Sequence, residues 1–260
     1  MSHNIHWVQF RIESLIMSPD THVSLTTIFS LPKGKTAKDY MDKLYARAKV
    51  ANKSIYYGIA TNENKLMCRE GYENAEDFLV YMKEIVSCQL GDEVTILVSG
   101  PGLELDKIKP KLTASIQAEI TFAELNNDNM LLGRLPKSTS DTHVTVLPEI
   151  TVPQGRMTEF KSVMEKFCSA AKNGTTGCLY YGFAVAGDMV WCREGYTGAE
   201  GVLEHLTEVK QPHEEGLLIL GEAGLKVHII GPASELEKLR PAMAPMGAIF
   251  WELDNMAYWK

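Results

Sequence analysis

His205 is the residue whose chemistry stands out first. It lies beside Val202, Leu203 and Leu206 in a segment with helical spacing, which places it at the edge of an apolar stripe. An imidazole titrates near neutral pH and can accept a proton from an acidic quinol or enol carbon. His205 is therefore a candidate catalytic residue, with Arg193 as the candidate that stabilises the resulting anion. The alternative is that His205 lies at the protein surface, or that it only supports neighbouring side chains and does not contact a substrate.

The segment before this helix carries further polar and aromatic candidates. In residues 189–196, strand alternation puts Cys192, Glu194 and Tyr196 on one face and Trp191 and Arg193 on the other. A buried charge needs its own partner, so the arginine and the glutamate either pair with neighbours at the strand end or orient a polar ligand. The cysteines in such a strand are expected to be small core residues. The candidate substrate-binding residues are Tyr181, Trp191, Glu194, Tyr196, Tyr57, Arg69, Tyr72 and Tyr81.

These candidates occur in two copies because the chain is internally duplicated. The string CREGYENAE at 68–76 returns as CREGYTGAE at 192–200, and Tyr-Tyr-Gly at 56–58 returns at 180–182. The matches continue in the same order to FAEL at 122–125 and FWEL at 250–253. A repeat of over a hundred residues is too long for a solenoid and suits two small domains.

Each copy has the same predicted order of elements. The second copy reads as a strand at 144–152, a helix after Gly155, a hairpin over 178–196, a helix that starts in a Thr197–Glu200 capping box, a strand at 225–231, a helix at 233–243 and a strand at 248–253. The first copy gives strands at 23–31, 93–100 and 118–125, a hairpin over 55–72, and helices at 36–51, from Ala75 and at 103–112. The stretch QPHEEG at 211–216 reads as a solvated loop.

This order predicts an α+β fold of two tandem ferredoxin-like units. Neither face of the predicted strands is wholly polar, so both faces of each sheet need covering. We therefore expect the two antiparallel sheets to pack face to face within one chain, as an intrachain dimeric α/β barrel. The first repeat spans 1–134 with an N-terminal extension over 1–20, a linker covers 135–143, and the second repeat spans 144–260.

Composition restricts the class of partner. The net charge is −7 without a basic cluster, which argues against nucleic acid, and no apolar run is long enough to span a membrane. Five cysteines without C-x-x-C spacing indicate free thiols in a reducing compartment, with the cytoplasm as the expected location. Nucleotide-binding and hydrolase motifs are absent. The spacing of His205, His213 and His228 predicts no metal site.

The residues Glu194, Tyr196, Glu200 and His205 at the strand-to-helix junction resemble the antibiotic-biosynthesis-monooxygenase-like proteins, a dimeric α/β-barrel family. The resemblance covers nearly all of both copies in element order. It implies a ligand cavity in each unit, with activities that include cofactor-free oxidation of quinols or anthrones, haem degradation and isomerisation. Other members of the family have no demonstrated reaction. One departure is that Tyr81 takes the His205 position in the first copy, so the two cavities are expected to differ.

Two functions follow as expectations. The chain either oxidises or isomerises a quinol-like or enolisable aromatic molecule as a cofactor-independent monooxygenase, or it is a non-catalytic ligand-binding or assembly module. An electron-rich substrate anion can itself reduce oxygen, so the first function needs no cofactor. Haem degradation is a weaker third option because the first copy has no helical histidine. The expected partner is a small molecule, and self-association is compatible with either function.

Overall fold

The computed structural model describes residues 21–85, 91–116, 118–126, 143–174, 177–221 and 224–259. The predicted N-terminal extension (1–20) and residues 135–142 of the predicted linker lie outside this range. The first half of the chain contains β1 (Val23–Ser30), α1 (Ala37–Ala51), β2 (Ser54–Asn62), β3 (Lys65–Tyr72), α2 (Ala75–Ile85), β4 (Asp92–Gly100), α3 (Gly102–Thr113) and β5 (Glu119–Leu125).

The second half repeats this order, and besides a short 3₁₀ helix, η2 (Ala244–Met246), it adds two elements. It contains β6 (Val144–Thr151), α4 (Met157–Asn173), β7 (Cys178–Ala186), β8 (Met189–Tyr196), α5 (Ala199–Glu208), α6 (Lys210–Leu220), β9 (Leu225–Gly231), α7 (Ala233–Met243), β10 (Ile249–Leu253) and β11 (Tyr258–Trp259). The additions are α6, which lies in the connection between α5 and β9, and β11, which pairs with β2 of the first half.

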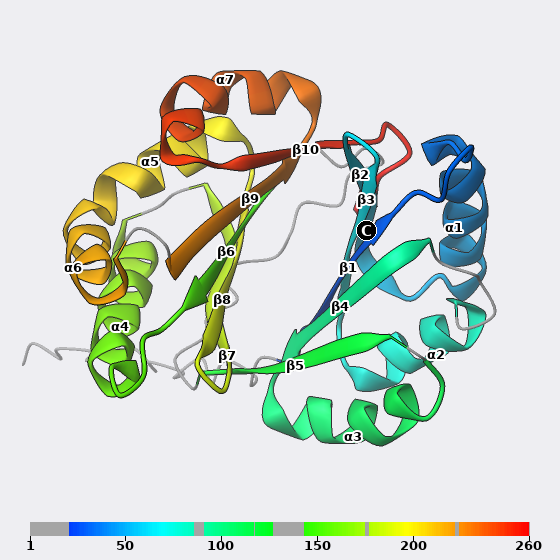
Figure 1. Cartoon of the computed structure of the whole chain (residues 1–260), viewed down its shortest axis with the longest axis horizontal. Coiled ribbons are helices and arrows are strands. Elements are labelled where there is room, and N and C mark those ends of the chain that lie inside the picture. Colours follow the sequence, from blue (N-terminus) through cyan, green and yellow to red (C-terminus); the bar gives the residue numbers. More distant parts are fainter. Residues whose placement is uncertain are drawn as a thin grey trace, which may run out of the picture.

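The strands of both halves form one closed barrel. Each half has the strand order fifth–fourth–first–third–second, and the halves join where β5 pairs with β7 and β10 pairs with β2. The helices lie on the outside, α1 to α3 over one sheet and α4 to α7 over the other (Figure 1). The predicted intrachain barrel is confirmed. The prediction of antiparallel sheets is wrong at one edge of each half, because β5 runs parallel to β4 and β10 runs parallel to β9.

Two apolar cores separate the helices from the sheets. In the first half, Phe29, Leu44 and Phe78 are fully buried between helices and strands, as are Phe160, Met164 and Leu239 in the second half. A third cluster, which includes Met67, Leu147 and Trp251, fills part of the barrel interior. Both faces of each sheet are therefore covered, as the apolar strands require. In the described part of the chain, no helix is long and apolar enough to cross a membrane.

The start of α5 differs from the predicted capping box. The helix begins at Ala199, and the side chain of Thr197 does not cap it. Instead, Glu235 of α7 accepts a hydrogen bond from the Ala199 backbone N–H (2.8 Å), and Glu104 of α3 accepts the equivalent bond from Ala75 (2.7 Å). A carboxylate at a helix N-terminus satisfies a free N–H and complements the helix dipole. The same capping carboxylate thus recurs in both halves, from a helix distant in sequence.

Two buried arginines join the halves across the barrel interior. Arg69 of β3 donates from Nη1 to the Thr145 hydroxyl (2.8 Å) and from Nη2 to the carbonyl of His143 (3.1 Å). Arg193 of β8 donates from Nη1 to the carbonyl of His22 (2.8 Å). Each guanidinium therefore bonds to the opposite half, and the arginines of the repeated string hold the two sheets together.

The glycine of the repeated string makes room for a tyrosine pair at the same end of the interior. The rings of Tyr56 and Tyr180 stack with centroids 5.8 Å apart and planes 7° from parallel. A Cβ at Gly195 would lie 2.2 Å from the ring of Tyr180, and a Cβ at Gly71 would lie 2.3 Å from the ring of Tyr56. No larger residue fits at either position while the tyrosines stay in place, so packing accounts for this part of the repeat.

Candidate functional site

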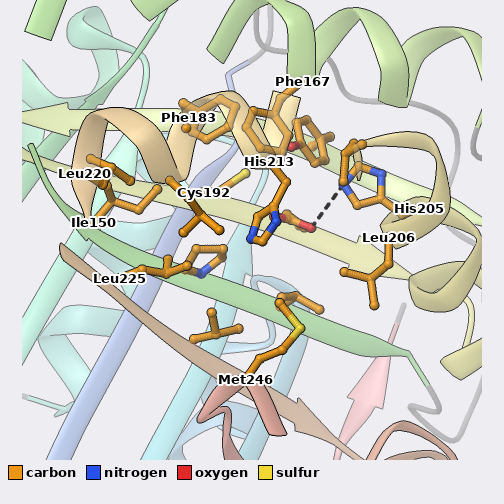
Figure 2. Close-up of a pocket in the computed structure, with 18 of the residues that line it drawn as sticks. Ile150, Phe167, Phe183, Cys192, His205, Leu206, His213, Leu220, Leu225 and Met246 are labelled. Atoms are coloured by element: carbon orange, nitrogen blue, oxygen red, sulfur yellow. Dashed lines mark ion pairs between the residues drawn. The ribbon is translucent and has the colours of Figure 1, made fainter. Parts of the chain in front are cut away.

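An apolar cavity of about 100 Å³ lies in the second half, between the outer face of the sheet and the helices. Strands β6, β7 and β8 form its floor, and α4, α5 and α6 form its walls. Figure 2 shows the ring of His213 projecting into the cavity from α6, with Phe167 and Phe183 on one side and Met246 on another. The polar residues that line it are Tyr181, Glu194, His205 and His213.

The insertion in the second copy creates this cavity. The connection between α5 and β9 spans 209–224, whereas the equivalent connection in the first half spans only 86–91. The extra residues form α6, which packs against α4 and contributes His213, Gly216, Leu217 and Leu220 to the lining. The prediction of a solvated loop at 211–216 is therefore wrong. Every residue that lines the cavity belongs to the second half.

A buried carboxyl forms the polar end of the cavity. Glu194 accepts a hydrogen bond from the hydroxyl of Tyr196 (2.6 Å), and the His205 Nε2 lies 3.8 Å from the Glu194 carboxylate. The His205 ring packs against the rings of Tyr181 and Tyr196, with centroids 5.1 and 5.4 Å away. The Glu194 carboxyl and the His205 imidazole therefore lie together at one end of the cavity, where both could contact a bound molecule.

Burial changes which of these groups carries charge. It raises the pKa of Glu194 to about 7, although the bond from Tyr196 works in the opposite direction. It also lowers the pKa of His205 to about 4. The separation of 3.8 Å is too long for a hydrogen bond, and the nearby carboxylate does not offset the cost of charging a buried imidazole. At neutral pH, His205 is neutral, and Glu194 is the group that titrates.

The first half keeps the carboxyl and surrounds it with tyrosine hydroxyls. The hydroxyls of Tyr72 and Tyr81 both donate to Glu70, the latter at 3.2 Å, and Tyr81 also bonds to Tyr57 (3.2 Å). Burial raises the pKa of Glu70 to about 8. Tyr81 thus fills the position of His205, as the sequence comparison indicates. The candidates Tyr57, Tyr72 and Tyr81 bond to one another or to Glu70 within the core.

The structure divides the other predicted site residues between two faces of the sheet. Glu194, Tyr181 and His205 line the cavity, and Tyr196 supports Glu194 from the same face. Arg193, Arg69 and Trp191 point into the barrel interior instead. Arg193 therefore does not meet His205 in one cavity, because alternate residues of β8 face opposite ways.

Sequence reasoning missed the residues of α6 as part of the site. Gly216, Leu217 and Leu220 follow His213 at intervals of three, four and seven residues, the spacing of one helix face. The signal was present in the sequence, but the neighbouring Gln211, Glu214 and Glu215 suggested a solvated loop. His228 lies in the barrel interior, on the opposite face of the sheet from His205 and His213. Among the described residues, no group of three or more histidine, cysteine or acidic side chains could hold a metal ion.

The two buried carboxyls predict a loss of stability at alkaline pH. Their pKa values in the folded protein, about 8 for Glu70 and about 7 for Glu194, lie above the ordinary value of 4.5, so the folded state holds their protons more tightly. The free energy of unfolding should therefore fall as pH rises through this range. Between pH 7 and 9 the two groups together contribute about 2 kcal/mol to this fall.

Urea unfolding of the wild type and of a Glu70→Gln/Glu194→Gln variant at both pH values would measure this contribution. The double variant should lack the loss of about 2 kcal/mol. The buried histidines act in the opposite direction mainly below pH 6.5, and they are common to both proteins. An identical pH dependence in the two proteins would contradict the prediction.

Comparisons with known proteins support the fold. No protein-family model matches the sequence, and no curated protein matches it. A solved protein from Fusobacterium nucleatum, provisionally named a monooxygenase, is 14% identical, with 80% of this chain and 90% of that chain covered and a TM-score of 0.51. MupZ from Pseudomonas fluorescens is 31% identical over 44% of this chain and 92% of its own, with a TM-score of 0.41. The chain thus has the same dimeric α/β-barrel fold as the Fusobacterium protein, with both ferredoxin-like units in one polypeptide.

Proposed function

We propose that the chain binds a small, single-ring quinol or enolisable aromatic molecule in the cavity of the second half and oxidises it with dioxygen, without a cofactor. The observation that carries this proposal is Glu194, a buried carboxyl with a pKa of about 7, at the polar end of a mostly apolar cavity. A base with a pKa near the working pH is well suited to proton transfer.

In this proposal the ionised Glu194 takes a proton from a ring hydroxyl. The substrate anion gives one electron to dioxygen, and the resulting superoxide and substrate radical combine at a ring carbon. Loss of water from the hydroperoxide leaves a carbonyl group at that carbon. For hydroquinone, the balance is hydroquinone plus dioxygen to hydroxybenzoquinone plus water. The protein supplies the base, the orientation and the exclusion of bulk water.

The size of the cavity limits the substrate. An apolar cavity of about 150 Å³ in another protein holds one benzene molecule, and the present cavity measures about 100 Å³. Because the present cavity is the smaller of the two, a single aromatic ring is the upper limit, and the walls must move outward slightly to admit it. A fused-ring substrate would require α6 to move away from α4.

A non-catalytic ligand-binding module is the second candidate. The observation that favours it is the recurrence of the carboxyl–tyrosine bond, since Glu70 and Tyr72 repeat Glu194 and Tyr196 in the half whose residues do not line the cavity. A bond that recurs in the half that does not line this cavity is suited to a structural role. In that case His205 and the cavity would serve recognition alone.

Oxygen uptake separates the two candidates. The purified protein is mixed with 1,4-hydroquinone in an oxygen electrode, with 1,4-difluorobenzene as a ligand of similar shape that has no hydroxyl proton to lose. Catalysis is supported if the protein increases oxygen uptake above the buffer rate with hydroquinone but not with the control ligand. The product should also contain one oxygen atom from labelled dioxygen. Saturable binding of both molecules without added uptake would refute the oxidase and favour the binding module.

A further inference from the structure

The barrel interior contains a second cavity, of about 190 Å³, on the opposite face of the sheets from the first. One wall consists mainly of two rows of side chains from β1, β4 and β5, in which strand register sets the neighbours: Thr26, Leu97 and Thr121 in one row, and Ile28, Thr95 and Glu119 in the other. The residues that line the facing wall, from β6, β8 and β9, are Leu147, Glu149, Trp191 and His228.

The cavity has a buried end and an open end. At the buried end, Leu147 and His228 pair across β6 and β9 and are 8% and 9% exposed. Two positions along the same strands, Glu149 pairs with Lys226, whose side chain is 65% exposed. Glu119 in the facing wall is likewise exposed. A molecule that enters the cavity therefore passes Glu119 and Glu149 first and reaches Leu147 and His228 last.

His228 directs a hydrogen-bond donor into the buried end. Its Nδ1 accepts a hydrogen bond from the Trp251 indole N–H (3.0 Å). An indole nitrogen only donates, so the proton of the neutral imidazole is on Nε2. Burial lowers the pKa of the ring, which keeps it uncharged at neutral pH. No described residue accepts a bond from Nε2–H, which is therefore left for a molecule in the cavity that His228 lines.

A donor at the buried end selects a ligand with a neutral acceptor. An ammonium group has no lone pair to offer to it. A carboxylate accepts hydrogen bonds but would be buried without a cation, because no lysine or arginine is among the described residues that line the cavity. Glu149 is already paired with Lys226 (3.1 Å) and Glu119 is exposed to water, so the open end adds little preference for a charge. A carbonyl oxygen fits, and the hydroxyls of Thr26 and Thr121 on the facing wall are further donors.

The volume and the apolar lining set the rest of the ligand. A cavity of about 150 Å³ in another protein holds one benzene molecule. About 190 Å³ therefore suits a six-membered ring with one or two further heavy atoms. Ile28, Leu97, Leu147 and Trp191 supply the apolar surface against which such a ring packs.

The donor belongs to the second half alone. Aligning Gly100-Pro101 with Gly231-Pro232 pairs Leu97 with His228, and aligning FAEL (122–125) with FWEL (250–253) pairs Ala123 with Trp251. The first half thus has two apolar residues where the second has the bond between indole and imidazole. The repeated unit folds without this bond, so its architecture does not explain why a buried imidazole faces the cavity.

We propose that the barrel interior is a second binding site, which takes a small neutral molecule with a carbonyl oxygen on an apolar ring. The oxygen accepts a hydrogen bond from His228 Nε2–H at the buried end, and the ring packs against Leu147 and Trp191. This site is separate from the proposed oxidation site, because the sheet lies between the two cavities, and it does not depend on that reaction.

Cyclohexanone is the probe that tests this proposal, with methylenecyclohexane and cyclohexylamine as controls of equal size. The first control has a methylene group in place of the oxygen, and the second is a cation at neutral pH. Calorimetric titration of the full chain, below the solubility limit of each probe, should give one cyclohexanone per chain, bound about tenfold more tightly than either control. Equal or tighter binding of a control would overturn the proposal. So would the lack of saturable binding of cyclohexanone, the result expected if the cavity takes only water.

Three variants locate the binding. His228→Leu/Trp251→Phe removes the donor without leaving a buried indole N–H unpaired. It should weaken cyclohexanone binding about tenfold but change methylenecyclohexane binding less than about twofold, which shows that the cavity is intact. Trp251→Phe keeps the imidazole and is the matched control, with cyclohexanone binding within about twofold of the wild type. His213→Trp, which enlarges a side chain in the cavity of the proposed oxidation site, should also leave it unchanged. Full-strength binding of cyclohexanone in the double variant, or its loss in His213→Trp, would place the ketone elsewhere and refute the site.

Discussion

Replacing Glu194 with glutamine is expected to lower the rate of hydroquinone oxidation about 100-fold or more, the usual contribution of a positioned general base. Glutamine keeps the shape of the side chain and can still accept the bond from Tyr196, but it cannot take a proton. In the wild type, the rate should rise with pH through the pKa of Glu194, about 7, because only the ionised carboxyl acts as a base. Oxygen uptake corrected for the buffer rate measures both effects.

Glu70→Gln is the matched control for this prediction. Glu70 occupies the same position in the repeat and forms the same bond to a tyrosine, but it does not line the cavity of the second half. Its substitution should leave the rate within about twofold of the wild type, since it does not touch the substrate. If Glu194→Gln oxidises hydroquinone as fast as Glu70→Gln does, Glu194 is not the base.

Replacing Arg69 with methionine is expected to lower the free energy of unfolding by about 3–5 kcal/mol, since each buried acceptor left without a donor costs about 1–3 kcal/mol. Arg69 donates to the carbonyls of His143 and Ile230 and to the hydroxyl of Thr145, all of which belong to the second half. Methionine fills much of the same volume but leaves these buried acceptors without their donor. A hydrogen bond that involves a charged group contributes about 1.5–3 kcal/mol, so their joint loss is large.

Urea unfolding of Arg69→Met beside Arg193→Met tests this expectation. Arg193 also bonds across the barrel, with donation from Nη1 to the carbonyl of His22 (2.8 Å) and to the hydroxyl of Ser24 (3.4 Å). Arg193→Met should therefore also lose stability, since it removes the donor of buried bonds between the halves. Wild-type stability in Arg69→Met would show that the arginines do not hold the two halves together.

The sequence contains most of the information about the fold because the fold depends on periodicity and repetition. Alternation in 189–196 correctly separated Cys192, Glu194 and Tyr196 from Trp191 and Arg193, since a strand places successive side chains on opposite faces whatever it packs against. The duplication then predicted a closed barrel within one chain, because two sheets with apolar faces on both sides cover each other.

The tertiary structure alone decided which residues form the site. Helix α6 has helical apolar spacing in the sequence, but Gln211, Glu214 and Glu215 made it read as a polar loop, and only its packing against α4 shows that this face is covered. Arg69 and Arg193 are bonded to residues more than 70 positions away, and no local pattern specifies such partners. Glu194 is a base near neutral pH because surrounding side chains exclude water from it. Local spacing determines which way a side chain points, whereas its charge and its partners depend on what the fold places around it.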